Sequence, residues 1–189
     1  MLLQFFLFKH KTAYEMLRSL VGSEMCIRDR NRVLKLQRKG TSHLQLVDAG
    51  KKAVAAGMEL SYYFLLGLGG RELWEEHVSE SAKVFNEVKP HFIRVRRLFI
   101  HPMSRLSEKV GSGEFREQTP EGTVIELRRL IAGLDAEGVT FACDHANNYL
   151  PVFGRLNAEK GRMLDIIDSF LALPERQRIA HYESIPSVI

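Results

Sequence analysis

The sequence predicts an α/β fold in which parallel strands alternate with helices. Three short runs rich in apolar and aromatic residues are typical of strands, at 58–66, 91–100 and 139–145. Segments with the spacing of amphipathic helices follow them, at 71–89, 120–134 and 158–173. Crossovers of ten or more residues join parallel strands, so the pattern indicates a doubly wound sheet or part of a (β/α) barrel.

The elements before and at the first strand are read from their spacing and boundaries. Residues 32–40 make a short helical piece that ends at Gly40, and Thr41 or Ser42 can cap a second helix over 43–56. The first strand, MELSYYFLL, is a nearly continuous apolar run that is too short for a helix. Such a run is typical of a strand buried on both faces.

The later elements have clear starts and stops. Thr119 and Pro120 form a cap and first-turn pair, which favours a helix start at that point. After the third strand, NNYLPVFGRL at 147–156 indicates a loop. Asn157 is expected to cap the last helix, and residues 174–189 are expected to form a polar tail.

In folds of this kind the ligand site lies at the carboxyl ends of the strands. GLGG, at 67–70, ends the first strand, and its glycines allow a ligand to approach the backbone closely. A tight strand-to-helix turn that needs positive φ explains the same residues equally well. GLGG is not a dinucleotide fingerprint, because Glu72 stands where GxGxxG needs its third glycine.

Two arginines alternate with apolar residues in the second strand. In FIRVRRLF, Arg94 and Arg96 share one face of the strand. If the apolar face meets helices, the arginines point inside the sheet or barrel, where guanidinium groups need carboxylate or phosphate partners. An edge strand with both arginines in solvent is the alternative.

A polar cluster follows the third strand. Asp144 and His145, with residues 147–149 close behind, fit either a ligand-orienting loop or a hydrogen-bonded turn. His101, after the second strand, is expected to face the same edge of the sheet. Cys143 is expected to fill the core.

Composition narrows the function classes. The chain has 189 residues, 26% of them charged, and a net charge of +4, but no basic run with interleaved aromatics favours a nucleic-acid partner. No run approaches the roughly 20 apolar residues that a membrane span needs. Cys26 and Cys143 form neither a disulfide framework nor a zinc motif, which favours a reducing, cytoplasmic location.

Several stretches resemble the C-terminal half of a radical S-adenosylmethionine (radical SAM) domain. They are RVLKLQRKGTS, AGKKAVAAGMELSYYFLLGLGG, FIRVRRLFIHPMSRL and DHANNYLPVFGRLNAEKGRMLDIID. The resemblance implies the C-terminal half of a partial (β/α)₆ TIM-like barrel with parallel strands. It also implies a [4Fe–4S] cluster, held by a CxxxCxxC motif, that reductively cleaves S-adenosylmethionine to a 5′-deoxyadenosyl radical for hydrogen abstraction.

The same resemblance implies site residues. The stretch MELSYYFLLGLGG corresponds to the family's fifth strand, whose end contacts the adenosine, and the cofactor-binding candidates are Leu65, Gly67, Leu68, Gly69 and Gly70. The candidates for binding the substrate or a carboxylate are Arg94, Arg96, Asp144 and His145. The chain departs from the family pattern in having Tyr63 where the family has a glycine.

A larger departure concerns the cluster. The chain has no CxxxCxxC, and three cysteine ligands are the minimum that this chemistry uses. The stretch AYEMLRSLVGSEMCIRDR follows no period and resembles a translated sequencing adapter. We therefore expect a non-native leader at 1–30, the C-terminal part of a radical SAM barrel at 31–173, and the polar tail after it.

The expected function is that of a fragment. The parent enzyme would use S-adenosylmethionine and a [4Fe–4S] cluster, a small-molecule substrate and an electron donor, with no membrane or nucleic-acid partner. The chain itself, without metal ligands, is expected to be inactive. The alternative is a non-radical α/β-barrel enzyme, or a small-ligand module that binds an anion.

Overall fold

The structure is a computed structural model of the chain that describes residues 43–186. Its strands form one open sheet in the order β1-β2-β3-β4, with bounds Ser61–Leu66, Phe92–Arg97, Thr140–Cys143 and Val152–Arg155. β1, β2 and β3 are parallel, and β4 is antiparallel to β3. The α/β prediction is confirmed, and the sheet is not closed into a barrel. The expected leader and the helical piece before residue 43 lie outside the described residues.

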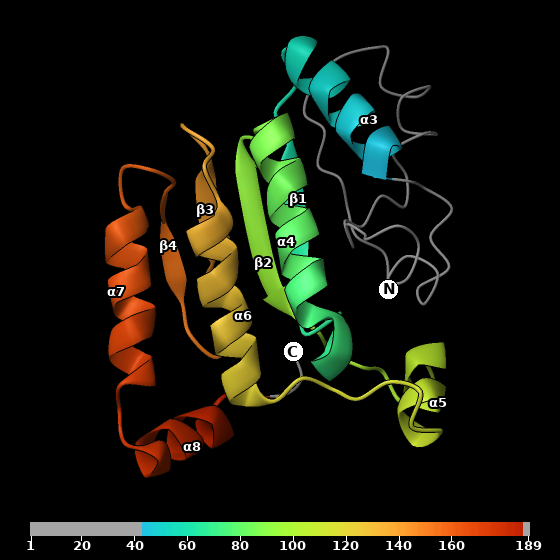
Figure 1. Cartoon of the computed structure of the whole chain (residues 1–189), viewed down its shortest axis with the longest axis vertical. Helices are drawn as coiled ribbons and strands as arrows, with labels where there is room; N and C mark the ends of the chain where they lie inside the picture. The colour runs from blue at the N-terminus through green and yellow to red at the C-terminus, as the bar shows by residue number, and fades with distance from the viewer. Residues whose placement is uncertain (1–42, 187–189) are drawn as a thin grey trace.

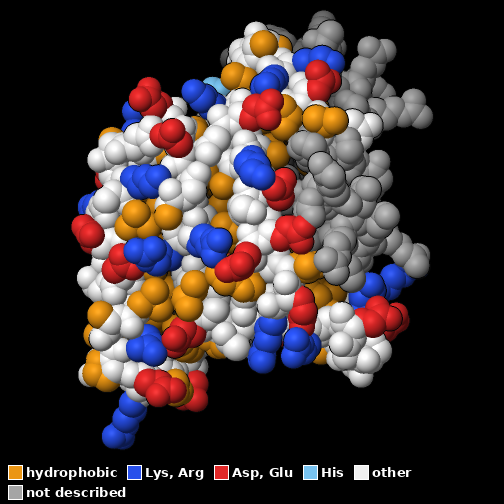
Figure 2. Space-filling view, viewed as in Figure 1, with side chains coloured by type: hydrophobic (Ala, Val, Ile, Leu, Met, Phe, Trp, Pro, Cys, Tyr) orange, Lys and Arg blue, Asp and Glu red, His pale blue; other side chains and the backbone are white. Residues whose placement is uncertain are grey.

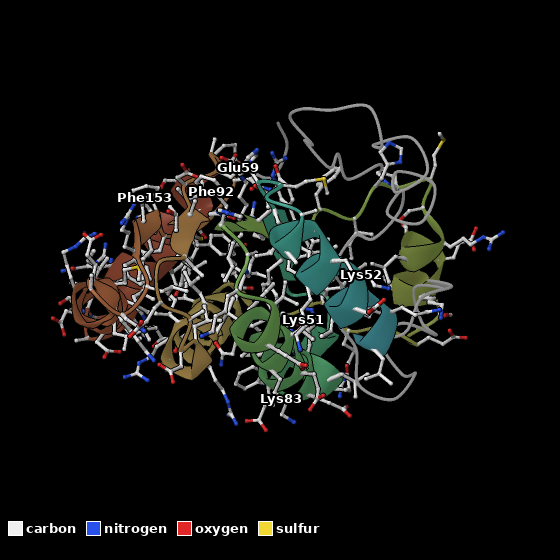
Figure 3. All side chains as sticks on the ribbon, turned by 90° about the horizontal axis from the view of Figure 1, so that it is seen from above. Lys51, Lys52, Glu59, Lys83, Phe92 and Phe153 are labelled. Atoms are coloured by element: carbon white, nitrogen blue, oxygen red, sulfur yellow. The ribbon has the colours of Figure 1, made fainter. Side chains whose placement is uncertain are left out.

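The helices have the bounds His43–Ala55 (α3), Gly70–Val88 (α4), Arg105–Gly111 (α5), Pro120–Gly133 (α6), Lys160–Leu171 (α7) and Glu175–Ser184 (α8). Of these, α4, α6 and α7 lie over one face of the sheet, whereas α5 and α8 lie at its lower end (Figure 1). Figure 3 shows Phe92 and Phe153 on the side of the sheet opposite to Lys83 of α4. Over α4, α6 and α7, basic and acidic side chains are interspersed (Figure 2), and Arg128 of α6 pairs with Asp168 of α7.

The core lies between the sheet and helices α4 and α6. In β1, Tyr62, Phe64 and Leu66 are buried, whereas Tyr63 and Leu65 are half-buried. The expectation that this strand is buried on both faces is therefore wrong. The run looks continuously apolar because its open face also has apolar and aromatic side chains.

Helix α6 begins as predicted. Thr119 has extended backbone dihedrals, and its Oγ1 accepts a hydrogen bond from the Gly122 N–H at 2.9 Å, with Pro120 as the first helical residue. The cap satisfies one of the free N–H groups of the first turn. The turn places the start of α6 beside the carboxyl ends of β1 and β2.

Two predictions after β3 are wrong. Val152–Arg155 is a strand and not a loop, and it runs antiparallel, so the sheet is not wholly parallel. Its four residues alternate between buried and exposed, a pattern too short to stand out in the sequence. Helix α7 begins at Lys160 with Glu159 at its N-cap, and Asn157 instead has a left-handed backbone, with φ of 69°.

The outer edge of β4 is occupied by side chains from the start of α7. The Arg155 N–H donates to Glu159 Oε2 at 2.8 Å, and Arg162 Nη2 donates to the Phe153 carbonyl at 2.7 Å. These bonds use backbone groups that would otherwise face outward from the last strand. The pKa of Glu159 lies below its usual value, because its carboxylate accepts from the Arg155 N–H and also from the Arg162 guanidinium.

Part of the expected polar tail is helical. Helix α8 spans Glu175–Ser184 and buries Tyr182 against Tyr149 and Phe170. His181 Nε2 lies 2.6 Å from the Tyr149 carbonyl, which attaches α8 to the loop after β3. Across residues 43–186, no helix has the length and apolar character needed to cross a membrane.

Candidate functional site

Because β1, β2 and β3 are parallel, their carboxyl ends lie along one edge of the sheet. A cleft of about 250 Å³ opens at that edge. Its walls include Leu66, Gly67, Arg97, Leu98, Gln118 and Tyr149. The cleft is smaller than the roughly 300–1,000 Å³ of pockets that enclose a drug-sized ligand, so it can hold only part of such a molecule.

The glycine-rich turn after β1 is only partly open to this cleft. Gly67 lines it and has φ of 84°, in the left-handed region that favours glycine. Leu68, Gly69 and Gly70 are buried behind the turn. A Cβ at Gly70, whose φ is 60°, would lie 2.7 Å from the Arg116 carbonyl oxygen. The chain near Arg116 thus covers part of the turn, and Gly67, which is itself buried, borders the cleft.

The open face of the sheet carries the two predicted arginines. Arg94 and Arg96 share this half-buried face, as their alternation with apolar residues predicts, and Leu65 is paired with Arg96 across the strands. The Arg94 guanidinium carbon lies 5.2 Å from the Phe92 ring centroid, and that of Arg96 lies 5.5 Å from the Tyr63 centroid. Within residues 43–186 neither arginine has a carboxylate partner.

The polar cluster after β3 is held by hydrogen bonds within its own loop and to the backbone of β2. Asp144 is exposed, and His145 is half-buried with Nδ1 2.8 Å from Asn147 Oδ1. Asn148 is buried, and its side chain is hydrogen-bonded to the backbone of β2. In the described part of the chain, no hydrogen bond or ion pair joins Asp144 or His145 to Arg94 or Arg96. His101 is exposed and accepts from the Met103 N–H.

Three residues that sequence reasoning missed lie beside the cleft or behind it. Arg97 lines the cleft, and its guanidinium carbon lies 4.1 Å above the Tyr149 ring while its Nη2 donates to the Pro186 carbonyl. Glu126 of α6 and His77 of α4 are fully buried next to Gly67. For Glu126 and His77 the available signal was a polar residue within an apolar helix stripe, but the same stripes also contain the buried polar residues Thr123 and Ser81.

The described residues do not fit an iron–sulfur cluster. No group of three or more His, Cys, Asp or Glu side chains in residues 43–186 is arranged to hold a metal ion. Cys143 is fully buried, as expected of a core residue, and its Sγ lies 3.6 Å from the Leu150 carbonyl oxygen. Burial, followed by the charge of Asp144, raises the pKa of this thiol and disfavours the thiolate that iron needs.

Comparison with known proteins supports a fold and no closer relationship. No protein-family model and no curated protein matches the sequence. A solved structure of archaeal Elp3 from Methanocaldococcus infernus, with an N-terminal deletion (1–46), matches at a TM-score of 0.50 and 20% identity. The match covers 59% of this chain and 26% of that one, so the chain spans about a quarter of its length. At this identity the likeness shows the fold alone.

Proposed function

We propose that the chain is the C-terminal part of a radical SAM barrel and contributes one wall of an S-adenosylmethionine site. Two independent observations support this reading. Stretches of the sequence resemble this family, and the fold is similar to part of archaeal Elp3, a radical SAM enzyme. The open, mostly parallel sheet with helices on one face is consistent with a barrel segment.

One observation carries the proposal for binding. Arg94, in the middle of β2, and Arg96, near its carboxyl end, lie on the open sheet face without a carboxylate partner among the described residues. Guanidinium groups form strong, oriented hydrogen bonds with carboxylates, and the methionyl part of S-adenosylmethionine supplies one. Leu65 and Gly67 would then contact the adenosine, with Leu68, Gly69 and Gly70 forming the turn behind them.

The chain's own residues would bind and orient the cofactor and exclude water from it. When a [4Fe–4S] cluster is present, it supplies the electron that cleaves S-adenosylmethionine. Cys143 is unsuited to bind it, so the cluster ligands must come from another part of the parent protein. The chain as written is therefore inactive in this proposal, and the parent needs an electron donor and a small-molecule substrate in the cytoplasm.

The genomic sequence upstream of the Asn31 codon tests the proposal. We expect a continuous reading frame that encodes CxxxCxxC. The longer protein, reconstituted anaerobically with iron and sulfide, should be brown, oxygen-sensitive and able to produce 5′-deoxyadenosine from S-adenosylmethionine. A matched control changes the three motif cysteines to alanine and should produce none. An upstream frame without the motif would contradict the proposal.

The two arginines, which lack a carboxylate partner within residues 43–186, also favour a second candidate, a non-radical enzyme or binding module for an anionic small molecule. Arg94, Arg96, Asp144 and His145 would provide its polar contacts. In this case the longer protein stays colourless after reconstitution and binds a phosphate or carboxylate ligand. Titration with inorganic phosphate and with S-adenosylmethionine separates the two functions.

A further inference from the structure

A buried carboxylate holds the glycine-rich turn from behind. Glu126 of α6 is fully buried, and its Oε2 accepts a hydrogen bond from the Gly67 N–H at 2.9 Å. The two residues are 59 positions apart, so the bond joins the middle of α6 to the turn after β1. The Gly67 N–H therefore has a protein partner, and it is the other side of this residue that faces the cleft.

A buried histidine completes the arrangement. His77 of α4 is fully buried, and its Nδ1 lies 3.2 Å from Glu126 Oε1. An ionised carboxylate only accepts, so this contact requires the hydrogen on Nδ1. The imidazole stacks on Phe64 of β1 at 4.5 Å between ring centroids, and its Nε2 has no hydrogen-bond partner in the described residues.

Stability alone is a poor explanation for this pair. A buried carboxylate loses its hydration, and well-packed apolar side chains often stabilise a core as well or better. The neighbouring inward residues of α6, such as Val124 and Leu127, are apolar. Glu126 is the position in this stripe that contacts the turn, and the turn is where the sheet meets the cleft.

We propose that Glu126 is a positioning residue, oriented by His77, that fixes Gly67 in the conformation that shapes the cleft for the adenosyl group. The identity of the ligand in this inference rests on the proposed function, whereas the link between Glu126 and Gly67 is independent of it. Gly67 has a φ of 84°, and a Cβ placed on it would lie 3.7 Å from Gln118 Cβ and 3.8 Å from Leu98 Cβ. Both neighbours line the cleft, so a change in the Gly67 backbone changes its wall.

The experiment compares variants of the full 189-residue chain by nuclear magnetic resonance. Glu126→Leu removes the acceptor, while Glu126→Gln keeps an oxygen at the same place and loses the charge. Val88→Ala, in the core at the far end of α4, is the control for general destabilisation. The readouts are the hydrogen-exchange rate of the Gly67 amide relative to that of Phe64, and the dissociation constant for S-adenosylmethionine from a shift titration.

The expected results differ among the variants. Glu126→Leu should speed Gly67 exchange relative to Phe64 at least tenfold and weaken S-adenosylmethionine binding about tenfold. Glu126→Gln should speed this relative exchange about threefold and leave binding within threefold of the unaltered chain, a rescue by the conservative variant. Val88→Ala should change neither the exchange rate of Gly67 relative to Phe64 nor the dissociation constant for S-adenosylmethionine.

Each contrary result has one meaning. If relative Gly67 exchange is unchanged in Glu126→Gln, or in a folded Glu126→Leu, the positioning role is wrong; if Glu126→Leu does not fold, the Gln variant decides. If the relative exchange rate of the Gly67 amide rises but every folded variant binds S-adenosylmethionine equally well, the positioning role is wrong as well. If the unaltered chain and the parent protein both fail to bind S-adenosylmethionine while Gly67 responds, the proposed function fails and the link between Glu126 and Gly67 stands.

Discussion

The backbone N–H of Arg97 donates to the side-chain oxygen of Asn148 at 2.8 Å, beyond the point where β3 stops pairing with β2. Asn148 Nδ2 also donates to the Val95 carbonyl at 2.9 Å. One buried amide thus continues the hydrogen bonding of β2 where the last strand pair is Arg94 with Ala142. It also ties the loop after β3 to the edge of the sheet that holds the cleft.

Replacing this amide should destabilise the fold. Asn148→Ala leaves the Val95 carbonyl and the Arg97 N–H without their partner, and we expect a loss of about 2–4 kcal/mol in the free energy of unfolding. Asp144→Ala, at an exposed position of the same loop, should change it by less than about 0.5 kcal/mol. Urea denaturation measures both, and equal effects would contradict the role given to Asn148.

The arginines of the open face should affect binding and not stability. We expect Arg94→Gln and Arg96→Gln each to weaken S-adenosylmethionine binding about tenfold, because each removes one charge-assisted contact. Their half-buried ring contacts predict a stability change below about 1 kcal/mol. Arg128→Gln, which breaks a surface pair with Asp168, is the control and should leave the affinity unchanged. Isothermal titration calorimetry measures the affinities. If Arg94→Gln and Arg96→Gln bind S-adenosylmethionine as tightly as Arg128→Gln does, there is no carboxylate site on this face.

Gly70 should tolerate no side chain. Gly70→Ala adds the strain of an alanine at a φ of 60° to a contact of 2.7 Å with the Arg116 carbonyl oxygen, so we expect a cost of about 2–4 kcal/mol. Gly113→Ala has a φ of 77° but nothing within 4 Å of the new Cβ, and should cost about 1 kcal/mol. Thermal unfolding of the pair separates the steric effect from the conformational one.

Alkaline pH should destabilise the protein through Tyr182. Burial raises the pKa of Tyr182 to about 12 from an ordinary value of 10.0. The unfolded chain therefore loses this proton first, and the group's stabilising contribution, complete below about pH 10, is lost as the pH rises towards 12. Tyr182→Phe should reduce that fall by up to about 2 kcal/mol, as measured by denaturation at a series of pH values.

Two tyrosine variants also separate at neutral pH. The Tyr182 hydroxyl has no hydrogen-bond partner among the described residues, so Tyr182→Phe should leave stability unchanged or slightly raised at pH 7. Tyr62 Oη donates to the Leu46 carbonyl at 3.0 Å, and Tyr62→Phe should cost about 1 kcal/mol. A loss of that size in Tyr182→Phe would mean that its hydroxyl has a partner.

Local rules predicted the main elements because neighbouring residues determine them. The cap formed by Thr119 and Pro120 needs only its own turn, and β1 is recognised by a short apolar run between turn signals. β4 was missed because four residues that include Phe153 on the outside give no strong alternation. Helix α8 was read as a tail because it buries only Tyr182 and has no apolar stripe.

The features of the candidate site were likewise predictable from the sequence only in part. Alternation in β2 placed Arg94 and Arg96 on one face, which the structure confirms. The partner of Gly67 could not be found by spacing, since Glu126 reaches the turn from α6, and His77 contacts Glu126 from α4. Asn148 was noted only as part of a polar cluster, because its role depends on where β3 ends relative to β2.

The bonds from Glu159 and Arg162 to the last strand give the sheet a direction of growth. A polypeptide that tried to add beside Phe153 would first have to displace both side chains, and would meet the two guanidinium groups of Arg155 and Arg162. The other margin of the sheet is β1. Among the described residues, the addition of further strands, from the same polypeptide or another, is thereby steered to the edge formed by β1.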